Sequence, residues 1–284
     1  MTELNGALRE RLADAKAYIF DMDGTLVLGS PTGDGYVALP GAIAFLNLLR
    51  SKNIPFRVFT NGTAKSPPGY ASALRMAGLD IRDEDMMTPA TAAAIWFKKN
   101  GISRIRLLGG DGARVPLEQA GLQVHSHADD VSGIEAVFTA STMDLKFSQI
   151  HLACQDIWNG ALAATATDVR FFASRGGRAV SVSYAINQTL RGLTGKTIKV
   201  LGKPSKSSLH CALSLMGMSN SLAAKTVVVG DDPALEMRLA NVSGAIGVAV
   251  TTGITTREEF EALAAPMKPH CILQGMDDLV RIAQ

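Results

Sequence analysis

The chain has 284 residues, of which 47% are hydrophobic and 19% are charged, and its formal net charge is +2 at pH 7. This composition is typical of a folded globular protein and excludes a disordered chain. The small net charge and the lack of a basic run argue against a nucleic-acid partner. No apolar stretch is long enough to span a bilayer, and the polar N-terminus resembles neither a secretion signal nor a membrane anchor. The three cysteines lie far apart in apolar patterns, so we expect reduced thiols in a cytoplasmic protein.

The first strong pattern is the apolar run Ala17–Phe20, which predicts a strand buried on both faces of a sheet. It ends in Asp21, Asp23 and Gly24. Because side chains alternate along an extended backbone, the two carboxylates are expected on the same side, at the strand end where α/β sheets bind ligands. Such a pair suits a hard cation and an incoming phosphate. An ordinary turn is the alternative, since Asp and Gly dominate turns.

Strand and helix patterns alternate along the rest of the chain, which implies parallel strands joined by crossovers. The Gly- and Pro-rich segment 28–41 predicts a turn or small hairpin. Further strands are expected at 54–59, 104–108, 123–125, 136–140, 162–165, 199–201, 226–229, 245–250 and 271–273. Helices are expected from Pro40, and at 68–77, 91–99, 116–120, 147–158, 182–193 and 207–216.

Three more of these strands end in groups suited to phosphate chemistry. Strand 54–59 is followed by Thr60, Asn61 and Gly62, strand 199–201 by Lys203, and strand 226–229 by Asp231 and Asp232. Each group alone has an ordinary explanation as a turn, a solvated lysine or a helix cap. Four such groups in a row, each at the end of a buried strand, indicate one phosphate site. Asp232 before Pro233 also predicts a helix start, with Asp as the N-cap.

Four motifs, FDMDGTL, FTNGT, LGKP and VVVGDD, resemble those of the haloacid dehalogenase superfamily in order and over nearly the whole chain. The run VAVTTGITTREEFEAL and the insertion after the second motif resemble the NagD-like, para-nitrophenylphosphatase-like subgroup. The resemblance implies an α/β fold, with a doubly wound, Rossmann-like parallel-sheet core and an inserted α/β cap. We expect the core at 1–88 and 196–284 and the cap at 89–195.

The resemblance also implies a role for each motif residue. Asp21 is the expected nucleophile, which forms an aspartyl-phosphate, and Asp23 is the expected general acid and base. Mg²⁺ is expected on Asp21, the main-chain carbonyl of Asp23, and Asp231. The expected phosphate-binding residues are Gly24, Thr60, Asn61, Gly62 and Lys203.

Two places depart from the subgroup's pattern. The fourth motif has Glu236 where relatives usually have Asp, so Asp232 and Glu236 compete as the carboxylate that supports the metal, with Asp232 slightly favoured. The cap segment 165–168 reads Thr-Ala-Thr-Asp where relatives tend to have Thr-Asn-Pro-Asp. Asp168 and Arg178 are candidate substrate contacts there, with an ordinary surface role as the alternative.

The sequence therefore predicts a Mg²⁺-dependent phosphatase whose partner is a small phosphorylated metabolite, such as a sugar phosphate or a nucleotide. The second carboxylate disfavours dehalogenation, because an alkoxide leaving group needs an acid and a halide does not. A phosphotransferase or phosphomutase with the same intermediate, and a non-catalytic phosphometabolite-binding protein, are the alternatives. The resemblance also makes a homodimer through the cap plausible.

Overall fold

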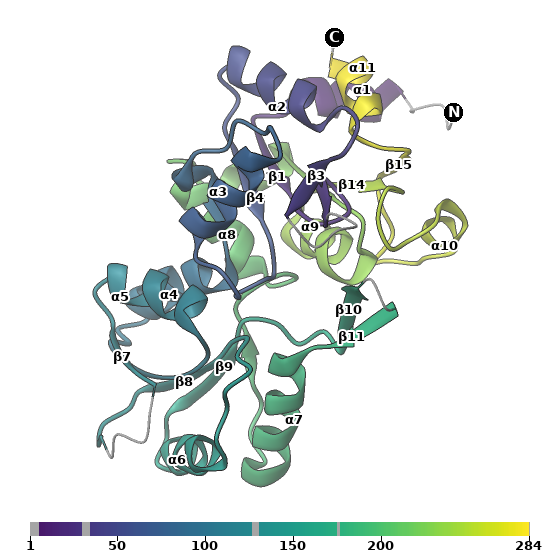
Figure 1. Cartoon of the computed structure of the whole chain (residues 1–284). Coiled ribbons are helices and arrows are strands. Elements are labelled where there is room, and N and C mark those ends of the chain that lie inside the picture. The colour runs from purple at the N-terminus through teal and green to yellow at the C-terminus, as the bar shows by residue number, and fades with distance from the viewer. Residues whose placement is uncertain (1–5, 30–34, 127–130, 175–176, 284) are drawn as a thin grey trace. The chain divides into compact units, whose positions relative to one another are not determined.

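The computed structural model describes residues 6–29, 35–126, 131–174 and 177–283, and the side chains of 171–179 lie outside that description. The chain forms two compact units (Figure 1). The first unit comprises Met1–Thr60, Pro68–Met87 and Leu209–Gln284, and the second comprises Asn61–Pro67 and Thr88–Ser208. Compact units need not coincide with domains, so the domain limits expected from the sequence stay a prediction.

The first unit is built on a six-stranded parallel sheet in the order β15-β14-β13-β1-β4-β5. Its strands are β1 (Ala17–Phe20), β4 (Phe56–Phe59), β5 (Met86–Met87), β13 (Thr226–Gly230), β14 (Ile246–Val250) and β15 (Cys271–Leu273). From β1 the chain adds β4 and β5 on one side, and later β13, β14 and β15 on the other. The order reverses between β1 and β13, and the carboxyl ends of strands at such a switch point form the usual ligand crevice of open α/β sheets.

Helices and short helical turns accompany the strands of the first sheet. They are α1 (Gly6–Ala13), α2 (Ala42–Ser51), α3 (Pro67–Met76), η1 (Asp83–Asp85), η2 (Asn220–Lys225), η3 (Pro233–Met237), α9 (Arg238–Ser243), α10 (Arg257–Glu261) and α11 (Met276–Ala283). Helix α8 (Lys206–Leu215) begins in the second unit and ends in the first. Helices α1 and α11 lie side by side (Figure 1).

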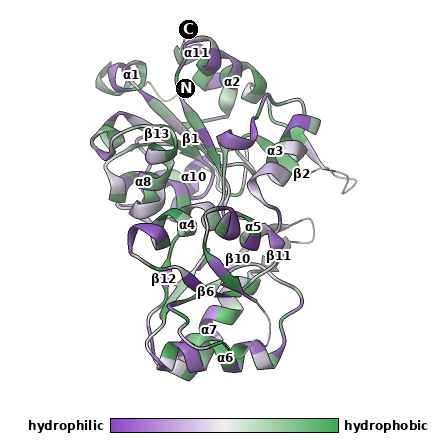
Figure 2. Cartoon of the chain, turned by 90° about the vertical axis from the view of Figure 1, so that its left-hand side faces the viewer, coloured by the Kyte–Doolittle hydropathy of each residue, from purple (hydrophilic) through white to green (hydrophobic). Residues whose placement is uncertain are grey.

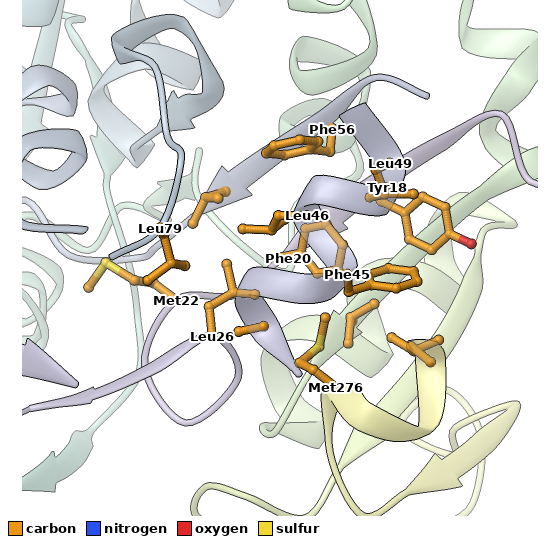
Figure 3. Close-up of a cluster of buried hydrophobic side chains, with 14 of the residues drawn as sticks. Tyr18, Phe20, Met22, Leu26, Phe45, Leu46, Leu49, Phe56, Leu79 and Met276 are labelled. Carbon is orange, nitrogen blue, oxygen red and sulfur yellow. The ribbon is translucent and has the colours of Figure 1, made fainter. Parts of the chain in front are cut away.

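Both faces of the first sheet are packed. On one face Tyr18 and Phe20 lie against Phe45 of α2, with ring centroids 5.3 and 6.0 Å apart and nearly perpendicular planes, and Met276 of α11 joins the cluster (Figure 3). Edge-to-face rings are a favourable arrangement of aromatic side chains. On the other face Ala249 packs with Met237 and Phe260. The predicted doubly wound α/β core is therefore confirmed.

The segment after β1 forms a two-stranded antiparallel hairpin. It consists of β2 (Val27–Gly29) and β3 (Tyr36–Ala38), with Leu28 opposite Val37. This confirms the hairpin alternative for the Gly- and Pro-rich segment. Residues 30–34 between the strands lie outside the described part of the chain.

The second unit has its own parallel sheet, in the order β12-β9-β8-β6-β7. Its strands are β6 (Arg104–Leu108), β7 (Gln123–His125), β8 (Ala136–Thr139), β9 (Leu162–Thr165) and β12 (Lys199–Val200), and its helices are α4 (Pro89–Lys99), α5 (Asp111–Gln119), α6 (Phe147–Trp158) and α7 (Val182–Thr194). One core contains Phe97 and Phe138, and a second contains Ile150 and Leu190. Along α6 hydrophilic and hydrophobic residues alternate (Figure 2), as a helix with one buried face requires.

Three elements differ from the sequence-based expectation. Strand β12 belongs to the sheet of the second unit, although the apolar pattern from 199 resembled a return to the first. Helix α5 begins at Asp111 rather than at Pro116, and Gly112 in its first turn packs so closely that a Cβ there would lie 2.3 Å from the carbonyl oxygen of Thr63. The antiparallel pair β10 (Phe171–Ser174) and β11 (Gly177–Val180) was not expected, because each strand has four residues and no strong alternation.

Within the described ranges, none of the helices combines the length and the apolar character needed to cross a bilayer. All three cysteines are among the described residues, and none of them forms a disulfide.

Candidate active site

Asp21 and Asp231 follow two neighbouring strands, β1 and β13. The main-chain N–H of Asp21 donates to the carbonyl oxygen of Val229 at 2.9 Å, so the strand pairing continues as far as Asp21 itself. The side chain of Asp231 is buried, at 5% exposure. Burial, and then the negative charge of Asp21, raise the pKa of Asp231 to about 7. A proton or a cation would relieve this repulsion, and carboxyl groups with such raised pKa values are concentrated at functional sites.

A slot formed by two glycines holds the Asp231 carboxylate. A Cβ on Gly24 would lie 2.5 Å from Asp231 Oδ2, and one on Gly253 would lie 1.8 Å from the same atom. The main-chain N–H of Ile254 donates to this oxygen at 2.9 Å. Gly24 also has a φ of +78°, in the left-handed region that favours glycine. The slot therefore accepts a carboxylate and excludes any larger residue at either glycine.

The loop after β14 was missed as part of the site. Besides the Ile254 contact, the Thr252 hydroxyl donates to the carbonyl oxygen of Gly24 at 2.6 Å and so joins this loop to the loop after β1. A signal was present in the sequence, because β14 ends in Thr-Thr-Gly much as β4 ends in Thr-Asn-Gly.

The oxygen donors around Asp21 and Asp231 fit a magnesium ion. Within the described residues no group of three or more His, Cys, Asp or Glu side chains is arranged to hold a metal. A set of two carboxylates and the main-chain carbonyl of Asp23 is nevertheless compatible with Mg²⁺, which is usually held by one or two carboxylates together with waters and phosphate oxygens. The repulsion between the buried Asp231 carboxylate and the half-buried Asp21 is the observation that favours a cation here.

Asp23 differs from Asp21 in its surroundings. Its side chain is exposed, whereas Met22 beside it is buried and points away, as the expected alternation requires. The turn that follows is closed by a hydrogen bond of 2.8 Å from Gly24 N–H to the Val27 carbonyl oxygen. Burial, and then the charge of Asp23, raise the pKa of Tyr36 on β3, so this phenol lies within reach of the field of Asp23. No sequence pattern marked Tyr36.

Asp232 and Glu236 both stabilise the turn that carries Asp231. Asp232 is the N-cap of η3, where its Oδ1 accepts from the N–H of Ala234 at 2.7 Å, so the predicted helix start is confirmed. Glu236 is 1% exposed, and its Oε2 accepts from the N–H of Asp232 at 3.1 Å. Its side chain packs so closely on Gly230 that a Cβ there would lie 2.1 Å from Glu236 Cγ. Which of the two carboxylates supports a metal stays a prediction.

The expected phosphate-binding residues are divided between the two units. Thr60 follows β4 in the first unit, next to the end of β1, and is 4% exposed. Asn61, Gly62 and Lys203 belong to the second unit. There Asn61 exchanges two hydrogen bonds with the main chain of Lys203. The structure thus brings Asn61 and Lys203 together, and their role toward phosphate stays a prediction.

The two candidate substrate contacts are placed differently. Both carboxylate oxygens of Asp168 accept hydrogen bonds from Arg191, at 3.0 and 2.7 Å, and Asp168 Oδ1 also accepts from Asn187. Arg178 lies on β11, and its side chain is outside the described part of the structure. Contact of either residue with a substrate stays a prediction.

Two family models match the chain. A haloacid dehalogenase-like hydrolase model matches residues 18–123, and a HAD-hydrolase-like model matches residues 200–279. The matches include the strand ends that carry Asp21, Thr60 and Asp231. They leave out most of the second unit.

Comparisons that cover most of the chain find phosphatases. The acid sugar phosphatase of Staphylococcus haemolyticus is 27% identical over 248 residues, which cover 87% of this chain and 89% of that protein. Among solved structures, the 4-nitrophenylphosphatase of Thermotoga maritima is 25% identical, with a TM-score of 0.84 over 96% of this chain and 99% of that one. The glycerol phosphate phosphatase of Mycobacterium tuberculosis in complex with magnesium shares the fold, with a TM-score of 0.81 at 22% identity over 94% of this chain and 77% of that one.

The fold and the strand-end carboxylates thus define a hydrolase of the haloacid dehalogenase type, and the enzyme is a phosphatase. The chain belongs to the haloacid dehalogenase superfamily. It shares its fold with the 4-nitrophenylphosphatase above and with NagD of E. coli K-12, to which it is 21% identical with a TM-score of 0.78 over 95% of this chain and 98% of that one.

Proposed function

We propose that the enzyme is a Mg²⁺-dependent phosphatase that hydrolyses small phosphomonoesters, with sugar phosphates as the first class to test. The observation that carries the proposal is the pair Asp21 and Asp231, set at adjacent strand ends with Asp231 buried in its glycine slot. The substrate class is suggested by the relatives, which are named as acid sugar phosphatases and as a glycerol phosphate phosphatase. Nucleotides and related metabolites are also small phosphomonoesters, so they stay among the candidate substrates.

The proposed reaction has two displacements at phosphorus. A carboxylate oxygen of Asp21 attacks, an O–P bond forms, and the ester O–P bond breaks while Asp23 donates a proton to the leaving alkoxide. Asp23 then takes a proton from water, which attacks the aspartyl-phosphate and releases inorganic phosphate, restoring Asp21. Asp23 suits both proton transfers because its side chain is exposed, whereas Asp231 is buried.

The remaining residues bind and balance charge in this proposal. Asp21, the carbonyl of Asp23 and Asp231 would hold Mg²⁺, which offsets the charge of phosphate and carboxylates when it is bound. Thr60, Asn61, Gly62, Gly24 and Lys203 would bind phosphate oxygens, through main-chain N–H groups, the Thr60 hydroxyl and the lysine ammonium.

The test is phosphate release from a panel of sugar phosphates, nucleotides and glycerol phosphates, with Mg²⁺ and with chelator. We expect Mg²⁺-dependent turnover by the wild type and a loss of at least about 10³-fold in Asp21→Asn, because the amide cannot act as the nucleophile. Asp111→Asn is a matched control, since the side chain of Asp111 is 90% exposed in the second unit. Activity that resists chelator, or that survives in Asp21→Asn, would contradict the proposal.

Two other results would select the alternatives. Transfer of the phosphoryl group to an added sugar alcohol in preference to water would define a phosphotransferase. Tight binding of a phosphorylated metabolite without turnover would define a binding protein.

We also propose a homodimer formed through residues 89–195, which light scattering of the wild type would test. The expected cytoplasmic location stays a prediction.

A further inference from the structure

Asn61 and Lys203 are linked through the side-chain amide of Asn61. Nδ2 of Asn61 donates to the main-chain oxygen of Lys203 at 3.0 Å, and Oδ1 accepts from the main-chain N–H of Lys203 at 3.0 Å. Because one amide bonds both main-chain groups of Lys203, it restrains the peptide planes on both sides of that residue. The side chain of Asn61 is thus committed to the backbone of Lys203.

Gly202 allows this close approach. A Cβ at Gly202 would lie 2.3 Å from the carbonyl oxygen of Ala166 and 2.9 Å from Asn61 Oδ1. The N–H of Gly202 donates to the same oxygen of Ala166 at 3.2 Å, and Lys203 itself is 1% exposed. The segment that carries Lys203 is therefore fixed on one side by Asn61 and on the other by the segment that follows β9.

Helix α7 stabilises the segment after β9. Nδ2 of Asn187 donates to the carbonyl oxygen of Thr167 at 3.1 Å and to Asp168 Oδ1 at 3.0 Å, while Arg191 donates two hydrogen bonds to Asp168. The hydroxyl of Thr167 in turn accepts from Asn61 Nδ2 at 3.3 Å. These contacts form a continuous path within the second unit from α7 to Lys203.

We infer that Asn61 is a positioning residue that sets the main chain of Lys203, and that α7 stabilises this arrangement through Asp168 and Arg191. The inference rests on the proposed function, in which Lys203 offsets the charge of the phosphate. The side chain of Asn61 then acts through Lys203, and its main-chain N–H is the group left to bind phosphate. Asp168, through its hydrogen bonds with Asn187 and Arg191, supports the segment after β9.

A double-mutant cycle on Asn61 and Lys203 tests the inference. Asn61→Ala is expected to lower kcat/KM for the best substrate by about tenfold to a hundredfold, since misplacing a charge-balancing group by about 1 Å costs that much. In the background of Lys203→Met, the same change is expected to cost less than about threefold, because residues that act as one unit are not additive. A merely structural role for Asn61 would give the full loss in both backgrounds.

A second measurement does not depend on turnover. Calorimetric titration of the Mg²⁺-loaded protein with inorganic phosphate is expected to show the same non-additive pattern in the dissociation constant. Asn100→Ala is the matched control, because Asn100 is an exposed residue of the same unit whose amide caps α4 through the carbonyl oxygen of Trp96. If Asn61→Ala does not fold, Asn61→Asp replaces it, since the carboxylate keeps the acceptor for Lys203 N–H and loses the donor to Lys203 O.

The outcomes separate the inference from the proposed function. Additive effects in the cycle, or an Asn61→Ala enzyme equal to the wild type, would overturn the positioning role while leaving the phosphatase proposal intact. If the wild type hydrolysed no phosphomonoester, the proposed function would fail. The phosphate titration would then decide the positioning role by itself, with a non-additive cycle supporting it and an additive cycle overturning it.

Discussion

The main-chain N–H of Ile254 donates to Asp231 Oδ2 at 2.9 Å, across 23 residues of sequence. The hydrogen bond joins the loop after β14 to the carboxylate at the end of β13, the strand next to it. Because Oδ2 is engaged in this way, Asp231 has a fixed orientation before any cation binds. A fixed carboxylate loses less conformational freedom on metal binding than a mobile one.

Gly253→Ala should weaken Mg²⁺ binding. The added Cβ would lie 1.8 Å from Asp231 Oδ2, so the carboxylate must leave its slot. We expect the Mg²⁺ concentration for half-maximal activity to rise by about tenfold or more, as for other residues that orient metal ligands. The thermal stabilisation of the protein by Mg²⁺, measured without substrate, should fall in parallel.

The control for this change is Gly192→Ala. Gly192 lies on α7, where a new Cβ would come within 4 Å of none of the described heavy atoms outside its chain neighbours and the backbone of its own helix, so the same substitution meets open space there. Its Mg²⁺ response should equal that of the wild type. A Gly253→Ala enzyme with an unchanged Mg²⁺ response would show that the slot does not orient Asp231.

Asp231→Asn should stabilise the metal-free protein and remove its response to Mg²⁺. In the wild type, burial and the charge of Asp21 raise the pKa of Asp231 to about 7, above the ordinary carboxyl value near 4. Because the pKa of Asp231 is raised in the folded state, its contribution to stability is fully present below the ordinary carboxyl value near 4. This contribution is lost as the pH rises from there through about 7. The asparagine carries no charge and avoids this loss.

Thermal unfolding in chelator at pH 5.5 and at pH 8.5 measures the effect. Between these two values the unfolding temperature of the wild type should fall by several degrees more than that of Asp231→Asn. At pH 8.5 the wild type should recover on addition of Mg²⁺, and the variant should not. Parallel pH profiles of the two proteins would count against repulsion between Asp21 and Asp231.

The strand ends of the first sheet could be predicted from sequence because strands buried on both faces are nearly continuous apolar runs. β1 and β13 stand out in this way, and the polar residues that follow them then fall at one edge of the sheet. Asp21 and Asp231 were paired for that reason. Of the two glycines of the slot, Gly24 could be predicted because it belongs to the first motif, whereas Gly253 lies in the loop after β14, which was missed.

Other features depend on contacts that leave no mark in the sequence. The bond from Ile254 to Asp231 uses a main-chain N–H, which every residue except proline possesses. Strand β12 has two residues, too few for its apolar pattern to show which sheet it joins. Its place is decided by pairing with β9, so the unit to which Lys203 belongs could not be read from the motif order.

The ion pair of Arg106 and Asp156 should be a main determinant of the stability of the second unit. Arg106 on β6 is 2% exposed and its Nε contacts Asp156 Oδ2 on α6, whose side chain is 12% exposed. Removing one partner of a buried ion pair takes compensation away from the charge that stays behind, at a cost of up to about 3–5 kcal/mol. We therefore expect Asp156→Ala to lower the free energy of unfolding of this unit by about that amount, and Asp156→Asn, which keeps an acceptor, to cost less.

Tryptophan fluorescence during urea unfolding isolates this effect. The two tryptophans of the chain, Trp96 and Trp158, lie on α4 and α6, so their emission reports on the second unit. Glu118→Ala is the matched control, because Glu118 lies in the same unit, its side chain is 48% exposed and its pair with Arg114 spans 3.5 Å, and such surface pairs contribute about 0–1 kcal/mol. Equal shifts of the tryptophan transition in Asp156→Ala and Glu118→Ala would show that the buried pair adds no more to stability than a surface one.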